Sequence, residues 1–155
     1  MEQGSNIDMS KLSTGEKIVL GGAVAYLVWT FIPVWYHADL GPFGSSNTNG
    51  FHGVTLLAWI LAVVAVLEIM LRSAMSLEFE LPIKSGLLHL GVAGLALLFT
   101  LLGLAAKPGG YGISWGIIVA LLIALVWAYG AYMMYSEPET MPMSPPGDMQ
   151  GGMPS

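Results

Sequence analysis

The chain has 155 residues, of which 55% are hydrophobic and only 10% are charged, and its mean hydropathy is +0.70. Soluble domains carry about 25% charged residues, so this composition argues against a water-exposed globular fold, and five Lys and Arg residues leave no basic surface for nucleic acid. The net charge is −5, and the absence of cysteine excludes disulfides, thiolate metal sites and thiol nucleophiles.

The apolar residues fall in four long blocks, which we interpret as membrane-spanning helices. A helix needs about 20 apolar residues to cross about 30 Å of hydrocarbon, and its backbone groups must bond within their own segment. After a polar leader over residues 1–17 without a cleavage site, the sequence predicts spans at about 18–35, 53–71, 86–106 and 112–134. We therefore expect an all-α, multi-pass protein of the cell (plasma) membrane, built as a four-helix bundle.

Local signals mark both ends of the first span. Ser13 or Thr14 can cap the helix, with Glu16 or Lys17 in its first turn. Pro33 lies near the other end, where its missing N–H and the kink that it causes are easily accommodated.

The basic residues predict the orientation of the spans. Four of them lie on the side of the N-terminus and Lys107 lies on the opposite side, so we expect both termini to face the cytoplasm. Aromatic residues at the two interfaces agree with this orientation. The expected outer belt consists of Trp35, Tyr36, Phe51, Tyr111 and Trp115. The expected inner belt consists of Trp127, Tyr129, Tyr132 and Tyr135.

The loop after the first span carries the residues most suited to bind a metal or a cofactor. His37, Asp39 and His52 flank this loop. Imidazole and carboxylate groups could bind a divalent metal, and the two histidines could be axial haem ligands. Their spacing is not diagnostic, and interfacial histidines in a polar loop are common, so the sequence predicts no cofactor.

The second span contains one acid, Glu68, about one turn from its cytoplasmic end. Arg72 follows at i+4, which is the favourable order for an ion pair on one helix face. His89 lies at a similar depth in the third span, so one possible partner of Glu68 is His89. Pairing of Glu68 with Arg72 near the interface is simpler, and a proton or ion relay is the alternative.

The fourth span carries five small residues at intervals of four, which form a helix-packing stripe. Small residues let helices approach closely in lipid, where apolar side chains alone do not drive association. Each step of four drifts about 40° around the helix, so two neighbours would share the stripe, or one partner would cross it at an angle. We favour packing within the bundle over a homodimer. The stripe consists of Gly112, Gly116, Ala120, Ala124 and Ala128.

Two polar segments lie on the cytoplasmic side. Residues 77–82 are expected to form a water-exposed loop. The tail over residues 135–155 is rich in Pro, Gly, Ser and Met, and we expect it to be disordered. Its methionines could bind Cu(I), although no His or Cys accompanies them. These methionines are Met141, Met143, Met149 and Met153.

The segment Leu12–His37, "LSTGEKIVLGGAVAYLVWTFIPVWYH", resembles a group of small bacterial membrane proteins with an LT/S-x-GEK leader and four predicted spans. In that group the first span ends in Pro-Trp, whereas here Val34 separates Pro33 from Trp35. The segment Asn49–Gly53, "NGFHG", and Leu81-Pro82 also match. The resemblance covers about Leu12 to Glu137. It implies a four-span architecture and no activity or site residues.

Motifs of catalysis are absent from the sequence: there is no G-x-S-x-G, H-E-x-x-H or P-loop, and no paired carboxylates lie within the spans. We therefore expect a non-enzymatic accessory or scaffold subunit of a membrane complex, with lipid and other membrane subunits as partners. Two alternatives stay open. One is a small oligomeric proton-linked transporter or channel that uses Glu68 and His89, and the other is a haem- or copper-associated subunit of a redox complex.

Overall fold

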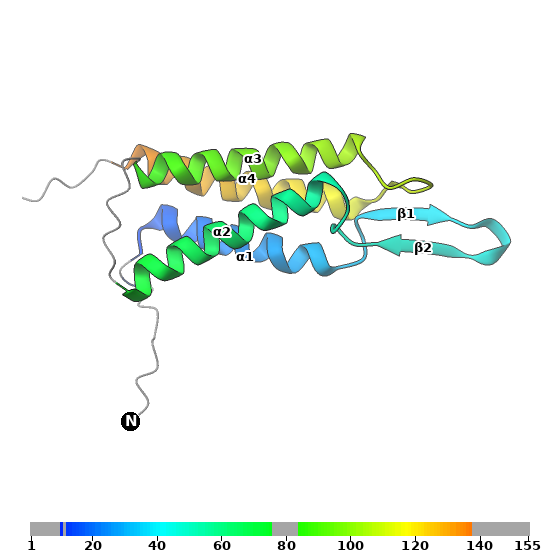
Figure 1. Ribbon diagram of the computed structural model, residues 1–155, viewed down its shortest axis with the longest axis horizontal. Coiled ribbons are helices and arrows are strands. Elements are labelled where there is room, and N and C mark those ends of the chain that lie inside the picture. Colours follow the sequence, from blue (N-terminus) through cyan, green and yellow to red (C-terminus); the bar gives the residue numbers. More distant parts are fainter. Residues whose placement is uncertain (1–9, 11, 76–83, 138–155) are drawn as a thin grey trace, which may run out of the picture.

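The computed structural model describes residue 10 and residues 12–75 and 84–137, which are mostly helical (Figure 1). The helices are α1 (Thr14–Phe31), α2 (Val54–Met75), α3 (Ser85–Ala105) and α4 (Trp115–Ser136). The strands are β1 (Tyr36–Asp39), β2 (Ser45–Thr48) and β3 (Gly112–Ile113), and they form an antiparallel sheet in the order β2-β1-β3. The described residues are mostly helical, with four helices as expected, but the fold is not all-α, because the loop between the first two helices folds into a hairpin that also pairs with the segment before α4.

Three of the described helices are long and apolar enough to cross a membrane. They are Val54–Ser73 within α2, with a mean hydropathy of 2.6, and the whole of α3 and α4, each with 2.2. The chain is therefore a candidate membrane protein. Helix α1 falls short of this standard because Glu16 and Lys17 lower its hydropathy. That α1 also crosses the membrane stays a prediction.

The two ends of α1 follow from local chemistry. Ser13 caps the helix in a capping box: its hydroxyl accepts from the Glu16 N–H, and the Glu16 carboxylate accepts from the Ser13 N–H. This confirms the expected cap. The helix ends at Phe31, so the predicted span to Trp35 is four residues too long. Pro33 excludes the helical conformation from the residue before it, and Ile32 accordingly adopts φ −75° and ψ 127°.

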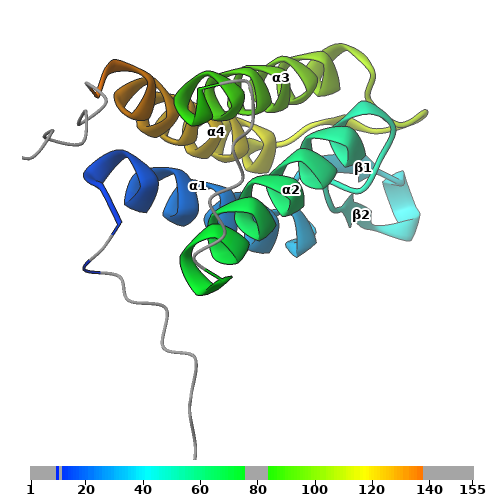
Figure 2. The same cartoon turned by 60° about the vertical axis from the view of Figure 1, so that its left-hand side comes forward.

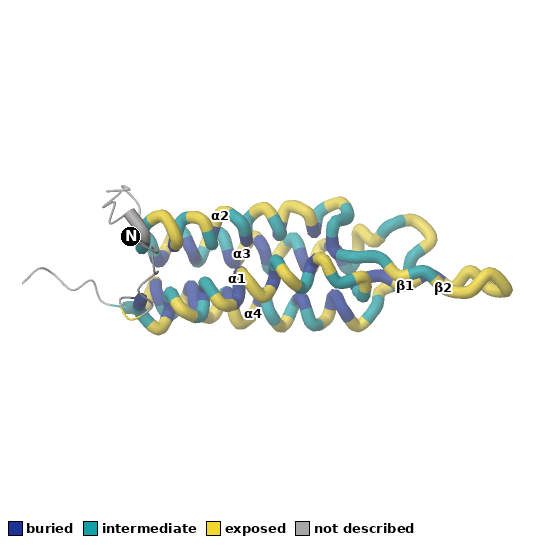
Figure 3. Tube along the Cα trace, turned by 90° about the horizontal axis from the view of Figure 1, so that it is seen from below, coloured by how far each residue is buried: buried dark blue, intermediate teal, exposed yellow. Residues whose placement is uncertain are grey.

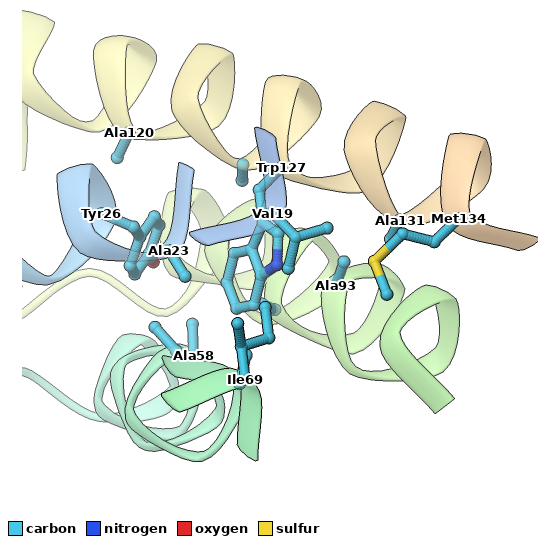
Figure 4. Packing of buried hydrophobic residues seen from close by; sticks show 14 of the residues in the cluster. Val19, Ala23, Tyr26, Ala58, Ile69, Ala93, Ala120, Trp127, Ala131 and Met134 are labelled. Carbon is cyan, nitrogen blue, oxygen red and sulfur yellow. The ribbon is translucent and has the colours of Figure 1, made fainter. Parts of the chain in front are cut away.

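The four helices lie side by side, and each packs against two others: α1 and α3 each contact both α2 and α4 (Figures 1 and 2). We call the end at which α1 and α3 begin the near end, and the opposite end, from which β1 and β2 project, the hairpin end. Buried residues line the interior of this helical part, and exposed ones cover its outside (Figure 3). The core includes Trp127, which reaches from α4 toward the other helices (Figure 4).

Helices α1 and α4 approach so closely that only glycine fits at their contact. A Cβ built on Gly22 would lie 2.8 Å from the Cβ of Trp127, and one built on Gly130 would lie 2.6 Å from the Ile18 Cγ2. Real Cβ atoms essentially never approach other atoms so closely. Small residues thus set the distance between these helices, as expected for packing in lipid.

The buried line on α4 differs from the predicted helix-packing stripe at both ends. Gly112 belongs to β3 rather than to the helix, and Ala128 is only half-buried. The buried line runs through Gly116, Ala120 and Ala124 and then shifts by three residues to Trp127. The shift compensates for the 40° that each step of four adds, so that the same face stays turned inward.

Three residues of the predicted aromatic belts lie instead in the core. Trp35, Tyr36 and Trp127 have no exposed surface. The Trp35 indole N–H donates to the Trp29 carbonyl at 3.0 Å, and the Tyr36 hydroxyl donates to the Gly103 carbonyl at 3.2 Å. The polar group of each side chain has its hydrogen-bond partner inside the protein, so Trp35 and Tyr36 cannot serve as interfacial anchors.

We expect Gly22→Ala to lower the free energy of unfolding by about 1–3 kcal/mol, because the new methyl group would overlap Trp127 and push α1 from α4. Gly21→Ala is the matched control on the same helix: nothing lies within 4 Å of its added Cβ, and alanine is the better helix former. Thermal unfolding in a mild detergent, followed by circular dichroism, measures both. Equal unfolding temperatures would contradict the close contact.

Candidate functional site

At the near end, a network of charged side chains joins three helices. Glu68 of α2 binds Arg72 one turn later, and its other oxygen, Oε2, accepts from the His89 Nε2 of α3 at 2.7 Å. His89 is 2% exposed, while the side chain of Glu68 is 24% exposed. The structure therefore brings together Glu68, Arg72 and His89, and Glu68 holds both of its candidate partners at once.

Arg72 extends the network to the start of α1 and α3. Its Nη1 lies 3.1 Å from the Glu16 Oε1, and its Nη2 donates to the Ser85 Oγ at 2.6 Å. The planar guanidinium carries five N–H donors, which allows one side chain to bind groups from several directions. Glu16 thus has two roles, since it also completes the capping box of α1.

The bonding of Glu68 favours a structural clamp over a proton relay. Both carboxylate oxygens of Glu68 accept hydrogen bonds. The carboxylate also fixes the His89 tautomer, because Nε2 must carry the proton that Oε2 accepts in the bond. The His89 Nδ1 is buried and has no hydrogen-bond partner in the described part of the chain. Its capacity for a hydrogen bond is therefore not used by the described residues.

A second polar group lies toward the hairpin end, inside the helical part. The Tyr26 hydroxyl and the Thr100 Oγ1 are 2.7 Å apart, and Thr30 donates to the Tyr26 carbonyl at 2.8 Å. All three residues are fully buried. Apolar residues separate this group from His89, since Ala93 and Ala96 are the buried positions between His89 and Thr100 on α3. The two polar groups are therefore separate.

At the hairpin end, β1 and β2 are joined by a turn whose geometry is fixed by backbone bonds. The Leu40 N–H donates to the Gly44 carbonyl at 2.8 Å, and the Asp39 Oδ1 accepts from the Gly41 N–H at 2.9 Å. Gly41 and Gly44 have φ values of 60° and 95°, which other residues rarely adopt. A turn with these bonds presents its side chains in a defined arrangement.

The tip of this hairpin exposes apolar side chains. Phe43 is 89% exposed and Leu40 is 50% exposed. Figure 1 shows the hairpin extending along the long axis of the helical part, beyond the ends of the helices, and Figure 3 shows its tip as exposed. An exposed Phe on a helix facing lipid needs no explanation, but this one lies away from the apolar helices. Sequence reasoning missed it because we interpreted the segment as a loop.

The three predicted ligand residues of this loop have separate partners. The His37 Nδ1 donates to the Asn47 Oδ1 at 2.8 Å, the His52 Nε2 lies 2.6 Å from the Thr48 Oγ1, and Asp39 holds the turn. In residues 12–75 and 84–137, no group of three His, Cys, Asp or Glu side chains could hold a metal ion. The redox-subunit hypothesis stays untested. The methionines of the tail and the loop at 77–82 lie outside the described residues.

No protein-family model matches this sequence, and no match to a curated protein or to a solved structure was found.

We expect Arg72→Met to lower the free energy of unfolding by about 1–2 kcal/mol, because it leaves the Glu16 and Glu68 carboxylates and the Ser85 hydroxyl without their common donor. Lys17→Met removes an exposed positive charge from the same end of the helical part and should change stability by less than about 0.5 kcal/mol. Unfolding of the two variants in one detergent gives the comparison. A similar loss in both would mean that charge at this end matters, and not the network.

Proposed function

We propose that this chain is a non-enzymatic accessory subunit of a membrane complex, and that it binds its partner through the β1–β2 hairpin. In this proposal all four helices cross the cell membrane as a bundle, with both termini in the cytoplasm and the hairpin on the outer side. The observation that carries the proposal is the 89% exposed Phe43 at the tip of a turn with fixed geometry.

The base of the hairpin supports this role because it is tied to the helices. The Gly116 N–H at the start of α4 donates to the Val34 carbonyl at 3.0 Å, and the Ser114 N–H donates to the Trp35 carbonyl at 3.1 Å. The hydroxyl of Tyr36, the first residue of β1, bonds α3, and burial raises the pKa of this phenol above its ordinary value. A preorganised arm loses little conformational freedom when it binds, which favours affinity.

The near-end network supports a scaffold more than a transporter. Three helices are joined there by Arg72 and Glu68, and every oxygen of Glu68 is bonded. A proton-linked pair of Glu68 and His89 remains the second candidate. The observation that favours it is the buried His89 Nδ1, which has no hydrogen-bond partner among the described residues.

The proposed orientation predicts which residues a membrane-impermeant maleimide reaches in intact cells. The natural chain has no cysteine, so single substitutions report without background. Lys107→Cys, in the connection between α3 and α4 on the hairpin side, should be labelled, whereas Lys17→Cys in α1 should be labelled only after the cells are opened; both positions are exposed in the structure. The reverse pattern would overturn the orientation, and labelling of both in intact cells would overturn the four-span arrangement.

We expect Phe43→Ser to reduce the partner recovered with the chain from a mild detergent by at least about tenfold, because a central aromatic anchor typically contributes about 2 kcal/mol or more. Phe43→Tyr keeps the ring and should retain the partner. The recovered complex is quantified against the chain itself. A wild-type chain that purifies as a lone species, or a Ser variant that keeps its partner, would refute the proposal.

A further inference from the structure

The small sheet has two outer strands, and the longer of them, β2, has an unpaired outer edge in the described part of the chain. Strand β1 lies in the middle and pairs with β2 on one side and with β3 on the other. The far edge of β2 therefore has no strand beside it within residues 12–75 and 84–137. Such an edge presents N–H and C=O groups that can pair with another chain.

The ladder shows which residues of β2 present these groups. In an antiparallel pair, successive residues direct their backbone groups alternately toward the partner strand and away from it. The Leu40 N–H bonds the Gly44 carbonyl, and Ala38 lies opposite Ser46 two residues further on. The backbone groups of Ser46 and Thr48 therefore face β1, and those of Ser45 and Asn47 face the open edge.

The two faces of the hairpin differ in how far their side chains are buried. On β1, Tyr36 and Ala38 are buried while His37 and Asp39 are exposed. On β2, the Ser46 Oγ lies 3.2 Å from the Tyr111 hydroxyl. One face is thus covered by the connection between α3 and α4, and the other is open. The edge of β2 carries no Lys or Pro, the residues with which proteins commonly block an edge strand.

Symmetry argues against a second copy of the chain as the occupant of this edge. Two β2 strands joined antiparallel are related by a twofold axis perpendicular to them. Figure 1 shows β1 and β2 running along the long axis of the helical part, which is the membrane normal if the helices cross. The axis would then lie in the membrane plane and would place the helices of the second copy away from the bilayer of the first.

We propose that the β2 edge binds an extended backbone segment of a different protein, whose surface also supplies an apolar pocket for Phe43. The segment would pair with the N–H and C=O groups of Ser45 and Asn47, as in strand addition to an open sheet. Backbone pairing suits an edge of small polar side chains, and Phe43 at the adjoining tip provides the apolar anchor. This inference rests on the proposed accessory function and names the chemistry of the partner.

Proline substitution at the edge tests the pairing in the full chain. Asn47→Pro removes an N–H that faces the open edge and leaves the ladder to β1 intact, while Asn47→Ala loses the same side chain but keeps the N–H. Benzoylphenylalanine in place of Phe43 serves as a photo-cross-linking probe in intact cells. We expect the Ala variant to cross-link to the partner as the natural sequence does, and the Pro variant to give about tenfold less product.

The outcomes separate the two proposals. Pairing of a different protein at the β2 edge is refuted if the cross-linked product is a second copy of this chain, or if the Pro and Ala variants give equal amounts of product. The accessory function is then decided by the recovery experiment with Phe43→Ser. If no protein is cross-linked or recovered with the natural sequence, both proposals fail. Thermal unfolding checks that Asn47→Pro is as stable as Asn47→Ala; where it is not, Ser45→Pro against Ser45→Ala decides by the same measurement.

Discussion

The close contact at Gly116 is the constraint on which the arrangement of hairpin and helices depends. Its N–H donates to the Val34 carbonyl, its carbonyl accepts from the Trp29 indole at 2.8 Å, and a Cβ there would overlap the Val34 carbonyl oxygen. This residue joins the exit from α1 to the first turn of α4. Because β1 follows Trp35 directly, the direction of the hairpin is set where these two helices meet.

A different kind of contact closes the opposite end. Arg72 binds acids or hydroxyls that come from α1, α2 and α3, so the near end is held by directional polar bonds, whereas the middle is held by close approach of small residues. Such a network is partly exposed, and its contribution to stability is modest. The network also fixes which helix ends lie together, since its bonds join the first turns of α1 and α3 to the last turns of α2.

The sequence predicts the helices well because their signals are local. About 20 apolar residues, a capping box and a proline each act over one or a few turns, so the three apolar helices and the start of α1 could be located. The end of α1 was missed because Pro33 acts on the conformation of Ile32, not only on its own hydrogen bond. Of the predicted site, the i+4 pair of Glu68 and Arg72 is also local.

The remaining features depend on contacts between distant parts of the chain. Glu16 and Arg72 are 56 residues apart, and only the packing of α1 against α2 brings them together. The hairpin had a local signal, the alternation in Tyr36–Asp39 before the Gly-Pro-Phe-Gly turn. The third strand of the sheet, β3, precedes α4, and it pairs with β1 because Ser114 and Gly116 bond the residues before β1. A pattern of residues cannot show such pairing.

Most polar side chains inside the helical part have partners within the protein, although the buried Trp59 Nε1, His89 Nδ1 and Trp127 Nε1 have none among the described residues. The buried hydroxyls of Tyr26, Thr30 and Thr100 bond within the protein, and Glu68 is bonded on both oxygens. The hairpin differs, because it combines a fixed backbone with an exposed ring at Phe43. Groups that already have partners offer little to a ligand, whereas an ordered arm with unpaired groups gains by binding. In the proposed function the helices are the support that holds this arm in a fixed direction.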